Sequence, residues 1–316
     1  MESTTKYNLI TILGPTASGK TRLGVTVARH LNTEIISADS RQVYKGMDLG
    51  TGKDLQIYDS LGRCVSYHLI NIVDPMKDFS VYDFQKRFYE AHAKITTKSR
   101  IPILVGGTGM YLDCVLRGYR MVEVPENPEL RLKISRMSEG EILDLLRSVG
   151  PELHNVTDTR DRWRMTRALE IHTFEKEHKD LLGNPPLTIN SLNFGMAIER
   201  TALRQGIRKR LHERIEAGML REAEQLHEMG VPWERFNYFG LEYRYMAMYL
   251  QRQISLSLMK EELAIRIGQF AKRQETWFRK MEREGIEIIW VGENDEAFVM
   301  KVLRDKGLLD ASNAAG

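Results

Sequence analysis

The sequence has little cysteine and no long apolar run. Its two cysteines, Cys64 and Cys114, form no CxxC pair, which excludes a disulfide scaffold and a zinc finger and favours a reducing compartment. The apolar run at residues 9–13 is far shorter than the roughly 18–20 residues that cross a bilayer. A glycine-rich loop follows it where a signal peptide would have its cleavage site. We therefore expect a cytoplasmic protein with no membrane partner.

The chain also lacks a strong net charge. Lys and Arg number 46 and Asp and Glu 43, so the formal charge of +3 does not by itself indicate a nucleic-acid-binding protein. The cations are nevertheless concentrated in two stretches: residues 200–214 and 266–283 each contain six, against one and two acids. A charged helix face is usually solvated surface, but such a concentration can also bind a phosphate backbone with salt-sensitive affinity.

Short apolar runs alternate with helical periods, which predicts an α/β fold. A length of 316 residues suggests about two lobes. Strands are expected at residues 9–13, 33–37, 101–105, 193–198 and 286–291, and helices at 21–31, 81–97, 201–218 and 257–284. Strands that alternate with helices form a mostly parallel sheet with helices on both faces. We expect the arrangement of the P-loop NTPases.

The strand pattern disappears in the middle of the chain. Charged helical segments are expected there at residues 139–148 and 161–179, with prolines between the elements. The pattern predicts an inserted, mostly helical domain at residues 123–192, within a core domain made of residues 1–122 and 193–316.

A glycine-rich loop follows the first expected strand and precedes the first expected helix. It fits the phosphate-binding pattern G-x-x-x-x-G-K-[ST], with Gly14, Pro15, Thr16, Ala17, Ser18, Gly19, Lys20 and Thr21 as its members. Backbone N–H groups and the helix N-terminus attract phosphate. Lys20 is expected to reach the terminal phosphate oxygens, and the hydroxyl of Thr21 to ligate Mg²⁺.

Two further expected strands end in polar or glycine-rich loops. Asp39 follows the second strand, and Gly106–Gly109 (GGTG) follows the third without the acid that an NTPase usually has there. The carboxyl ends of parallel strands meet at one crevice, which would combine a phosphate loop, a carboxylate and a hydroxyl. This set fits transfer from a diphosphate ester better than NTP hydrolysis. On its position alone, Asp39 fits a helix cap equally well.

Six motifs together resemble the tRNA dimethylallyltransferases, also called tRNA isopentenyltransferases. They span about residues 9–290 in the family's order: GPTASGKT (14–21), SADSRQVYKGMDLGTGK (37–53), HLINIVDP (68–75), PILVGGTGMYL (102–112), RALEI (167–171) and AKRQETWFRK (271–280). The resemblance implies transfer of a dimethylallyl group from dimethylallyl diphosphate to N6 of adenosine-37, next to the tRNA anticodon. It also implies a P-loop that holds diphosphate and Mg²⁺ rather than ATP, and a flipped-out target base. The absence of the zinc finger of eukaryotic relatives indicates the bacterial type, for which we expect a monomer.

The resemblance assigns roles to single residues. Asp39 matches the base that accepts the N6 proton, and Thr108 the hydroxyl that binds the bridging oxygen of the leaving diphosphate. Arg210 matches an arginine that neutralises the leaving group, although the alignment alone distinguishes it from its basic neighbours. The positions that match tRNA contacts are Asp39, Ser40, Arg41, Gln42, Arg131, Trp163, Arg164, Met165, Thr166 and Arg167. Trp277 and Phe278 are expected in the core.

The sequence departs from the family's patterns at a few positions. Gly206 stands where the R-I-x-x-R pattern has its first arginine, and Glu242 where G-Y-[KR] has glycine. Ile267 and Gly268 replace a Thr-Arg pair. None of these positions has an assigned catalytic role. We therefore expect a divergent member of the family whose affinity for tRNA, or choice of tRNA, differs.

Three other functions remain open at this point. A small-molecule P-loop kinase also uses an acid after the second strand, but it leaves GGTG and the insertion unexplained. An adenylate isopentenyltransferase shares the fold and donor but prenylates free AMP or ADP, for which two basic helices are not needed. A non-catalytic tRNA-binding module would not need the set of acid, hydroxyl and lysine.

Overall fold

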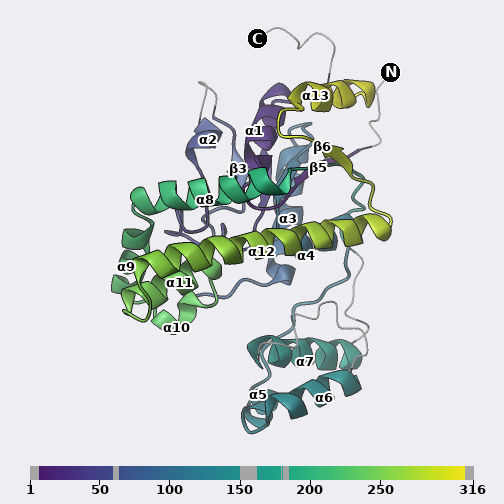
Figure 1. Cartoon of the computed structure of the whole chain (residues 1–316). Coiled ribbons are helices and arrows are strands. Elements are labelled where there is room, and N and C mark those ends of the chain that lie inside the picture. Colours follow the sequence, from purple (N-terminus) through teal and green to yellow (C-terminus); the bar gives the residue numbers. More distant parts are fainter. Residues whose placement is uncertain (1–6, 60–63, 150–161, 179, 181–184, 310–316) are drawn as a thin grey trace. The chain divides into compact units, whose positions relative to one another are not determined.

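The chain forms two compact units. The computed structural model describes residues 7–59, 64–149, 162–178, 180 and 185–309. The core unit consists of Met1–Gly118 and Leu187–Gly316, and the small unit of Tyr119–Pro186 (Figure 1). The predicted insertion, 123–192, overlaps the small unit, but the small unit ends earlier because residues 191–196 already form a strand of the core unit.

The core unit contains a parallel sheet of six strands within the described residues, in the order β3-β2-β4-β1-β5-β6. The strands are Leu9–Leu13 (β1), Ile35–Ala38 (β2), Tyr67–His68 (β3), Ile103–Gly106 (β4), Ser191–Met196 (β5) and Ile289–Val291 (β6). The predicted α/β class and all five predicted strands are confirmed, although β5 begins two residues before its predicted start. The edge strand β3 was not predicted, because two residues are too short to produce a pattern.

Three helices contribute to an apolar cluster on the sheet: Lys20–His30 (α1), Gln56–Asp59 (α2) and Glu296–Asp305 (α13). Two others, Val81–Thr96 (α3) and Gly109–Leu116 (α4), pack against each other and lie outside this cluster. Ile10 and Ile12 of β1 cluster with side chains of α1 and α13, among them Val25, Val27, Val299 and Met300. This packing fixes β1, and with it the loop that follows β1.

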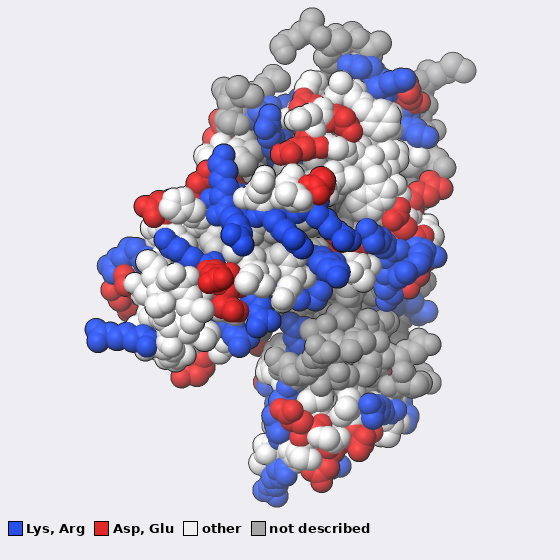
Figure 2. Space-filling model, viewed as in Figure 1, with Lys and Arg blue, Asp and Glu red and all other residues white. Residues whose placement is uncertain are grey.

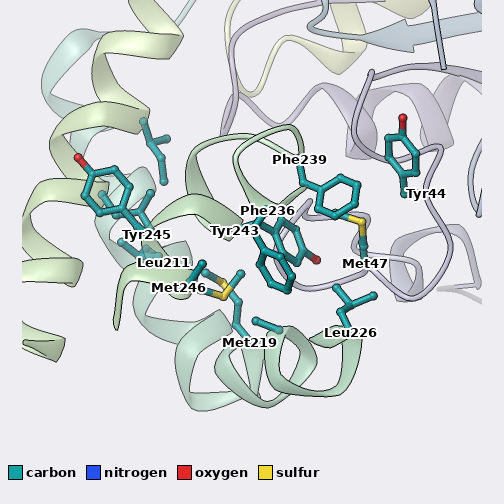
Figure 3. Close-up of a cluster of buried hydrophobic side chains, with 14 of the residues drawn as sticks. Tyr44, Met47, Leu211, Met219, Leu226, Phe236, Phe239, Tyr243, Tyr245 and Met246 are labelled. Carbon is teal, nitrogen blue, oxygen red and sulfur yellow. The ribbon is translucent and has the colours of Figure 1, made fainter. Parts of the chain in front are cut away.

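Five further helices build a second apolar cluster in the core unit (Figure 3). They are Arg200–Glu216 (α8), Met219–Glu228 (α9), Trp233–Phe236 (α10), Leu241–Leu250 (α11) and Leu256–Arg283 (α12). Phe236, Phe239 and Tyr243 form edge-to-face pairs in this cluster, which also includes Tyr44 and Met47 from the segment after β2. The cluster therefore fixes that segment against α8–α12.

The small unit is helical, as predicted, and has a core of its own. Its helices are Pro128–Ser135 (α5), Glu139–Val149 (α6) and Arg162–Glu177 (α7); positions 161 and 179, the predicted limits of the last helix, lie outside the described residues. The side chain of Asn127 caps α5, and Pro128 occupies its first turn. Ile134, Ile142, Leu146, Met165 and Leu169 are buried together. In the described part of the chain, no helix is both long and apolar enough to cross a membrane.

Candidate active site

Three loops of the core unit meet at the carboxyl edge of its sheet. Gly106, the last residue of β4, pairs with Ala38 at the end of β2 and with Leu13 at the end of β1. The strands therefore end level with one another, so the loops at 14–19, 39–42 and 107–108 leave the sheet side by side. The backbone N–H of Thr108 donates to the carbonyl of Ala38 at 3.2 Å. The predicted crevice thus corresponds to a real convergence of loops.

The first loop has the conformation that a phosphate loop needs. Ala17 and Gly19 have positive φ angles of 61° and 78°, so the chain turns tightly before α1 begins at Lys20. A Cβ at Gly14 would lie only 2.7 Å from the hydroxyl of Ser18. The Ser18 hydroxyl is buried and has no hydrogen-bond partner among the described residues, so it can donate to an anion bound by the loop.

Lys20 is held over this loop. Its ammonium donates to the carbonyl of Pro15 at 3.2 Å. Burial lowers the pKa of Lys20 to about 8, against the attraction of Asp39, which raises it; the charge of Arg210 lowers it further. Lys20, Asp39 and Arg210 are therefore close enough to interact, as the sequence predicted for residues of one site.

The donor set fits magnesium. Thr21, the predicted ligand, lies half-buried in the first turn of α1, three residues after Ser18. No group of three or more His, Cys, Asp or Glu side chains that could hold a metal occurs in the described part of the chain. Mg²⁺ is typically bound by one or two protein oxygens together with phosphate oxygens of the substrate. A hydroxyl next to a phosphate loop is that kind of site.

Asp39 and Thr108 belong to one hydrogen-bonded turn. The Oδ1 atom of Asp39 accepts from the backbone N–H of Arg41 at 2.9 Å and of Gln42 at 3.4 Å. Thr108 Oγ1 accepts from the N–H of Ser40 at 3.0 Å and lies 3.4 Å from the Ser40 hydroxyl. Asp39 thus caps its own turn with one oxygen, and the described residues give its Oδ2 no hydrogen bond. The capping and catalytic interpretations of Asp39 are compatible, since each uses a different oxygen.

Close approach explains the glycines after β4. A Cβ at Gly106 would lie 2.2 Å from the carbonyl oxygen of Ala38, and one at Gly109 would lie 2.4 Å from the ring of Trp277. Trp277 is half-buried and Phe278 fully buried. Both residues therefore pack inside the core unit, as expected from their spacing.

Gln274 of α12 is a residue of the site that the sequence analysis missed. Its Oε1 accepts from the N–H of Thr16 at 2.9 Å, and its Nε2 donates to the carbonyl of Gly107 at 2.8 Å. One buried side chain thus joins the phosphate loop to the GGTG loop. The signal for it in the sequence is its place in the motif AKRQETWFRK, next to basic and aromatic residues that are the more usual RNA contacts.

Arg210 of α8 faces the same site. Its guanidinium pairs with Asp54 at 2.5 Å, and that of Arg214, one helical turn later, lies 3.4 Å from the same carboxylate. Both arginines line a small cavity with Thr16 and Ala17 of the phosphate loop. Among the basic residues of α8, the structure thus places Arg210 next to the phosphate loop, but together with a second arginine that the alignment did not select.

Three of the four departures from the family pattern lie in or near this part of the core unit. Glu242 and Ile267 are among the lining residues of the small cavity. Burial raises the pKa of Glu242, and the positive charge of Arg214 opposes that effect. A Cβ at Gly206 would lie 3.9 Å from the carbonyl oxygen of Ala17. These three departures are therefore changes beside the phosphate loop.

Basic side chains gather over α8 and α12 on the face shown in Figure 2. A groove of about 440 Å³ runs between the two helices. Its polar rim includes Arg200, Arg204, Arg208 and Lys272, and Gly268 lies on its α12 side. Cations from both basic stretches of the sequence thus line one groove, while Arg210 and Arg214 line the cavity beside the phosphate loop.

Of the predicted tRNA contacts after β2, two are held by other parts of the core unit. The guanidinium of Arg41 lies over the ring of Tyr238, 5.3 Å from its centroid. The amide of Gln42 accepts from the hydroxyl of Ser37 at 3.1 Å and donates to the carbonyl of Gly52 at 3.2 Å. These contacts hold both residues in place beside Asp39.

Two predicted tRNA contacts in the small unit form a buried ion cluster. Arg131 donates twice to Glu170, at 2.6 and 3.2 Å, and Arg167 donates to the same carboxylate at 2.7 Å. The side chain of Glu170 is fully buried. Arg131 and Arg167 therefore help to build the unit, and their contact with tRNA stays a prediction.

The remaining predicted contacts lie on α7. The ring of Trp163 is 46% exposed, whereas Met165 is 1% exposed and packs in the core of the small unit. The hydroxyl of Thr166 bonds to the carbonyl of Arg162, and Arg164 is exposed. The side chain of Met165 is thus not available to RNA in this structure, while those of Trp163 and Arg164 are on the surface.

The fold and sequence were compared with those of known proteins. The profile of the IPP transferase family matches residues 42–281, and that of the isopentenyl transferases matches residues 7–60, which include the phosphate loop and Asp39. The chain is 51% identical over 290 residues to tRNA dimethylallyltransferase 1 of Syntrophus aciditrophicus, covering 91% of this chain and 94% of that protein. It belongs to the IPP transferase family. A second relative, tRNA dimethylallyltransferase 1 of Geotalea uraniireducens, is 50% identical over 289 residues, with coverage of 91% and 94%.

Solved structures of the IPP transferase family have the same fold. The crystal structure of a tRNA isopentenylpyrophosphate transferase from Bacillus halodurans aligns with a TM-score of 0.66 at 31% identity, covering 95% of this chain and 98% of that one. A eukaryotic dimethylallyltransferase acting on tRNA aligns with a TM-score of 0.73, covering 94% and 78%; at 23% identity this likeness concerns the fold alone. The resemblance seen in the sequence motifs is therefore confirmed at the level of family and fold.

Proposed function

We propose that this IPP transferase moves the dimethylallyl group of dimethylallyl diphosphate to N6 of adenosine-37, next to the anticodon of tRNAs. The products would be N6-(dimethylallyl)adenosine and diphosphate. Relatives about 50% identical over nine-tenths of the chain are tRNA dimethylallyltransferases. The observation that carries the proposal in this chain is the hydrogen-bonded placement of Asp39 and Thr108 at the edge of the phosphate loop.

The diphosphate of the donor fits the phosphate loop. The N–H groups at the start of α1, the ammonium of Lys20 and the guanidinium of Arg210 would surround its oxygens. The hydroxyl of Thr108 would donate to the bridging oxygen, whose negative charge grows as the C–O bond breaks. Magnesium held by Thr21 and the phosphates would supply further positive charge for the leaving diphosphate.

The carboxylate of Asp39 serves the acceptor. As N6 of adenosine forms a bond to C1 of the dimethylallyl group, the bond from C1 to the bridging oxygen breaks and N6 must lose a proton. Asp39 Oδ2, which the turn does not use, would accept that proton. An exocyclic amine is a weak nucleophile, so a fixed carboxylate is the group that this chemistry needs.

The tRNA would lie along basic and polar side chains of the chain. Ser40, Arg41 and Gln42 stand beside the proposed base, and the groove between α8 and α12 offers cations for the phosphate backbone. Arg131 and, on α7, Trp163, Arg164, Thr166 and Arg167 are proposed as further contacts from the small unit. We propose action as a cytoplasmic monomer.

The test is transfer from labelled dimethylallyl diphosphate, with Mg²⁺, to unmodified tRNA and to AMP in parallel. We expect label in tRNA only. Label in AMP would indicate an adenylate isopentenyltransferase, and ADP formed from ATP with a small acceptor would indicate a kinase. No label in either acceptor would contradict the proposed donor or the proposed reaction.

A further inference from the structure

Arg214 has an environment that the assigned chemistry does not explain. It follows Arg210 by one turn of α8, and the two guanidinium groups share one carboxylate, that of Asp54. Like-charged side chains one turn apart on a helix repel each other, and a single carboxylate neutralises only one of them. The other acid that lines the cavity is Glu242, whose pKa is raised by burial and lowered by the charge of Arg214. Two guanidinium groups thus share one ion-paired carboxylate, and the side chain of Arg214 is only 16% exposed.

The guanidinium of Arg214 rests on the backbone of Gly52. A Cβ at Gly52 would lie 1.9 Å from Nη2, 2.5 Å from Cζ and 2.6 Å from Nη1 of Arg214. Gly52 also has a positive φ of 64°, which L side chains rarely adopt. Only glycine leaves room for the guanidinium in this place.

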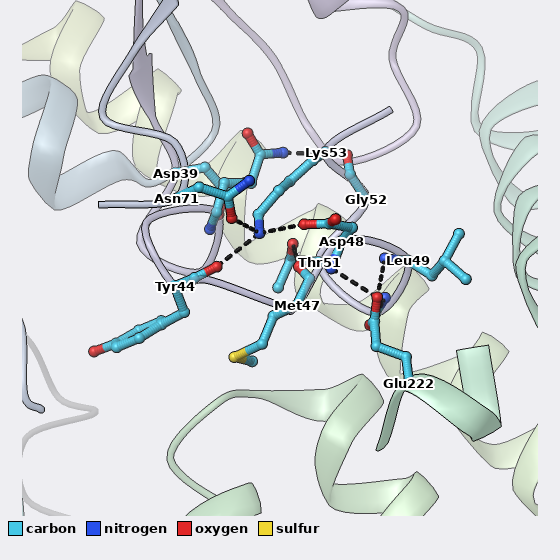
Figure 4. Close-up of polar contacts among 12 residues, drawn as sticks. Asp39, Tyr44, Met47, Asp48, Leu49, Thr51, Gly52, Lys53, Asn71 and Glu222 are labelled. Atoms are coloured by element: carbon cyan, nitrogen blue, oxygen red, sulfur yellow. Dashed lines mark hydrogen bonds and ion pairs between the residues drawn. The ribbon is translucent and has the colours of Figure 1, made fainter. Parts of the chain in front are cut away.

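The loop that carries Gly52 and Asp54 is rigid (Figure 4). The buried ammonium of Lys53 donates to Tyr44 O at 2.6 Å, Asp48 Oδ1 at 2.7 Å and Asn71 Oδ1 at 2.5 Å. The carboxylate of Glu222 accepts from three successive N–H groups of the loop, at 2.7, 2.7 and 2.9 Å. Because these hydrogen bonds fix the loop, Gly52 and Asp54 hold the guanidinium of Arg214 in one position.

The position of Arg214 is beside the phosphate loop. It lines the same cavity as Thr16, Ala17 and Arg210. The position on α8 where the family pattern has its first arginine, 206, is glycine in this chain and lies next to Ala17. One turn before Arg210, at position 206, α8 thus has no cation. One turn after it, at position 214, α8 has an arginine whose guanidinium packs on Gly52.

We propose that Arg214 is a second diphosphate-binding arginine of this enzyme, seated by Gly52 and Asp54, and that it replaces the arginine missing at position 206. This inference rests on the proposed function, because the diphosphate is that of the prenyl donor and of the product. On binding, the two guanidinium groups share their charge between Asp54 and the diphosphate oxygens. Arginine suits this task because its planar fork binds two oxygens at once.

The experiment measures the affinity of the full chain for inorganic pyrophosphate with Mg²⁺ by calorimetry. Arg214→Gln should weaken binding by about tenfold to a hundredfold, as for one charge-assisted hydrogen-bonded contact, while the affinity for tRNA stays within about twofold. Arg304→Gln, the same substitution at an exposed position of α13, should bind pyrophosphate as the unchanged chain does.

Gly52→Ala is the second variant. Its Cβ would push the end of the Arg214 side chain aside, so it should reproduce the loss of pyrophosphate affinity with Arg214 still present. Pyrophosphate affinity of Arg214→Gln equal to that of Arg304→Gln would overturn the inference and leave the proposed function standing. Absence of pyrophosphate binding by the unchanged chain would overturn both. Weakened binding in Arg214→Gln, with no prenyl transfer to tRNA by the unchanged chain, would support the diphosphate-binding role of Arg214 and contradict the proposed function.

Discussion

The carboxylate of Asp39 has two tasks that one substitution can separate. In Asp39→Asn the side-chain Oδ1 still accepts from the N–H groups of Arg41 and Gln42, so the turn is retained, but an amide does not take up a proton. We expect turnover to fall by about 10²–10⁴, as for the loss of a positioned base, with tRNA affinity nearly unchanged. Single-turnover prenyl transfer and tRNA binding, measured on the same preparation, check this. A collapse of tRNA affinity would instead make Asp39 a structural or binding residue.

The charge state of Lys20 predicts a pH dependence. Burial lowers the pKa of Lys20 to about 8, below the ordinary 10.5. The side chain is therefore fully protonated well below pH 8, and its charge is lost as the pH rises through that value. A diphosphate binds the ammonium and not the neutral amine. The affinity for pyrophosphate should therefore fall as the pH rises from about 7 to about 9.5. The side chain of Lys20→Arg stays charged over this range, so the pH dependence of its pyrophosphate affinity should no longer contain the loss of the Lys20 charge. If pyrophosphate affinity changed with pH in the same way in both proteins, Lys20 would not be the group that titrates.

At the scale of the elements, two glycines that look alike in the sequence have opposite roles. Gly268 lies inside α12, and apart from the backbone of its own helix no atom of the described residues comes within 4 Å of the place of its Cβ. Gly268→Ala should therefore raise the free energy of unfolding by about 0.5–1 kcal/mol, the helix-propensity difference between the two residues. Gly106→Ala should lower it by roughly 1–3 kcal/mol, since its Cβ meets the backbone oxygen of Ala38. Urea unfolding of both variants checks whether the free energy of unfolding rises in Gly268→Ala and falls in Gly106→Ala. A lower free energy of unfolding in Gly268→Ala would contradict the open space around its Cβ.

The elements that the sequence predicts well are those defined by local pattern. β1 is an apolar run before a phosphate loop, α8 and α12 are long periods, and each was placed within a few residues. The short helices α9–α11 were not predicted, because four to ten residues give fewer than three helical turns over which a pattern can repeat. Contacts distant in the sequence were also beyond prediction. Gln274 joins two loops that precede it by more than 160 residues, and the seat of Arg214 depends on one glycine at position 52. The motifs thus identified which loops form the site, but not which side chains hold those loops together.

At the scale of the whole molecule, the two units have separate cores, and the small unit depends on a buried charge. Burial alone would raise the pKa of Glu170, but hydrogen bonds from Arg131 and Arg167 outweigh it and lower that pKa. A carboxyl with a depressed pKa in the folded state contributes stability that is complete above its unfolded pKa of about 4.3. That contribution is lost as the pH falls through the folded value. The small unit should therefore weaken in acid through this residue.

Glu170→Gln tests this dependence and the independence of the units. The variant leaves Arg131 and Arg167, whose side chains are 32% and 24% exposed, facing a neutral amide. Loss of the charge on the acceptor of these hydrogen bonds costs roughly 1.5–3 kcal/mol. Hydrogen exchange should then speed up in α5–α7 at neutral pH, while β1 and β4 keep the protection that they have in the unchanged chain. Because the lost contacts are all within Tyr119–Pro186, equal loss of protection in β1 would mean that the two units unfold as one. In that case the buried cluster around Glu170 would stabilise the active site as well as the surface proposed to meet tRNA.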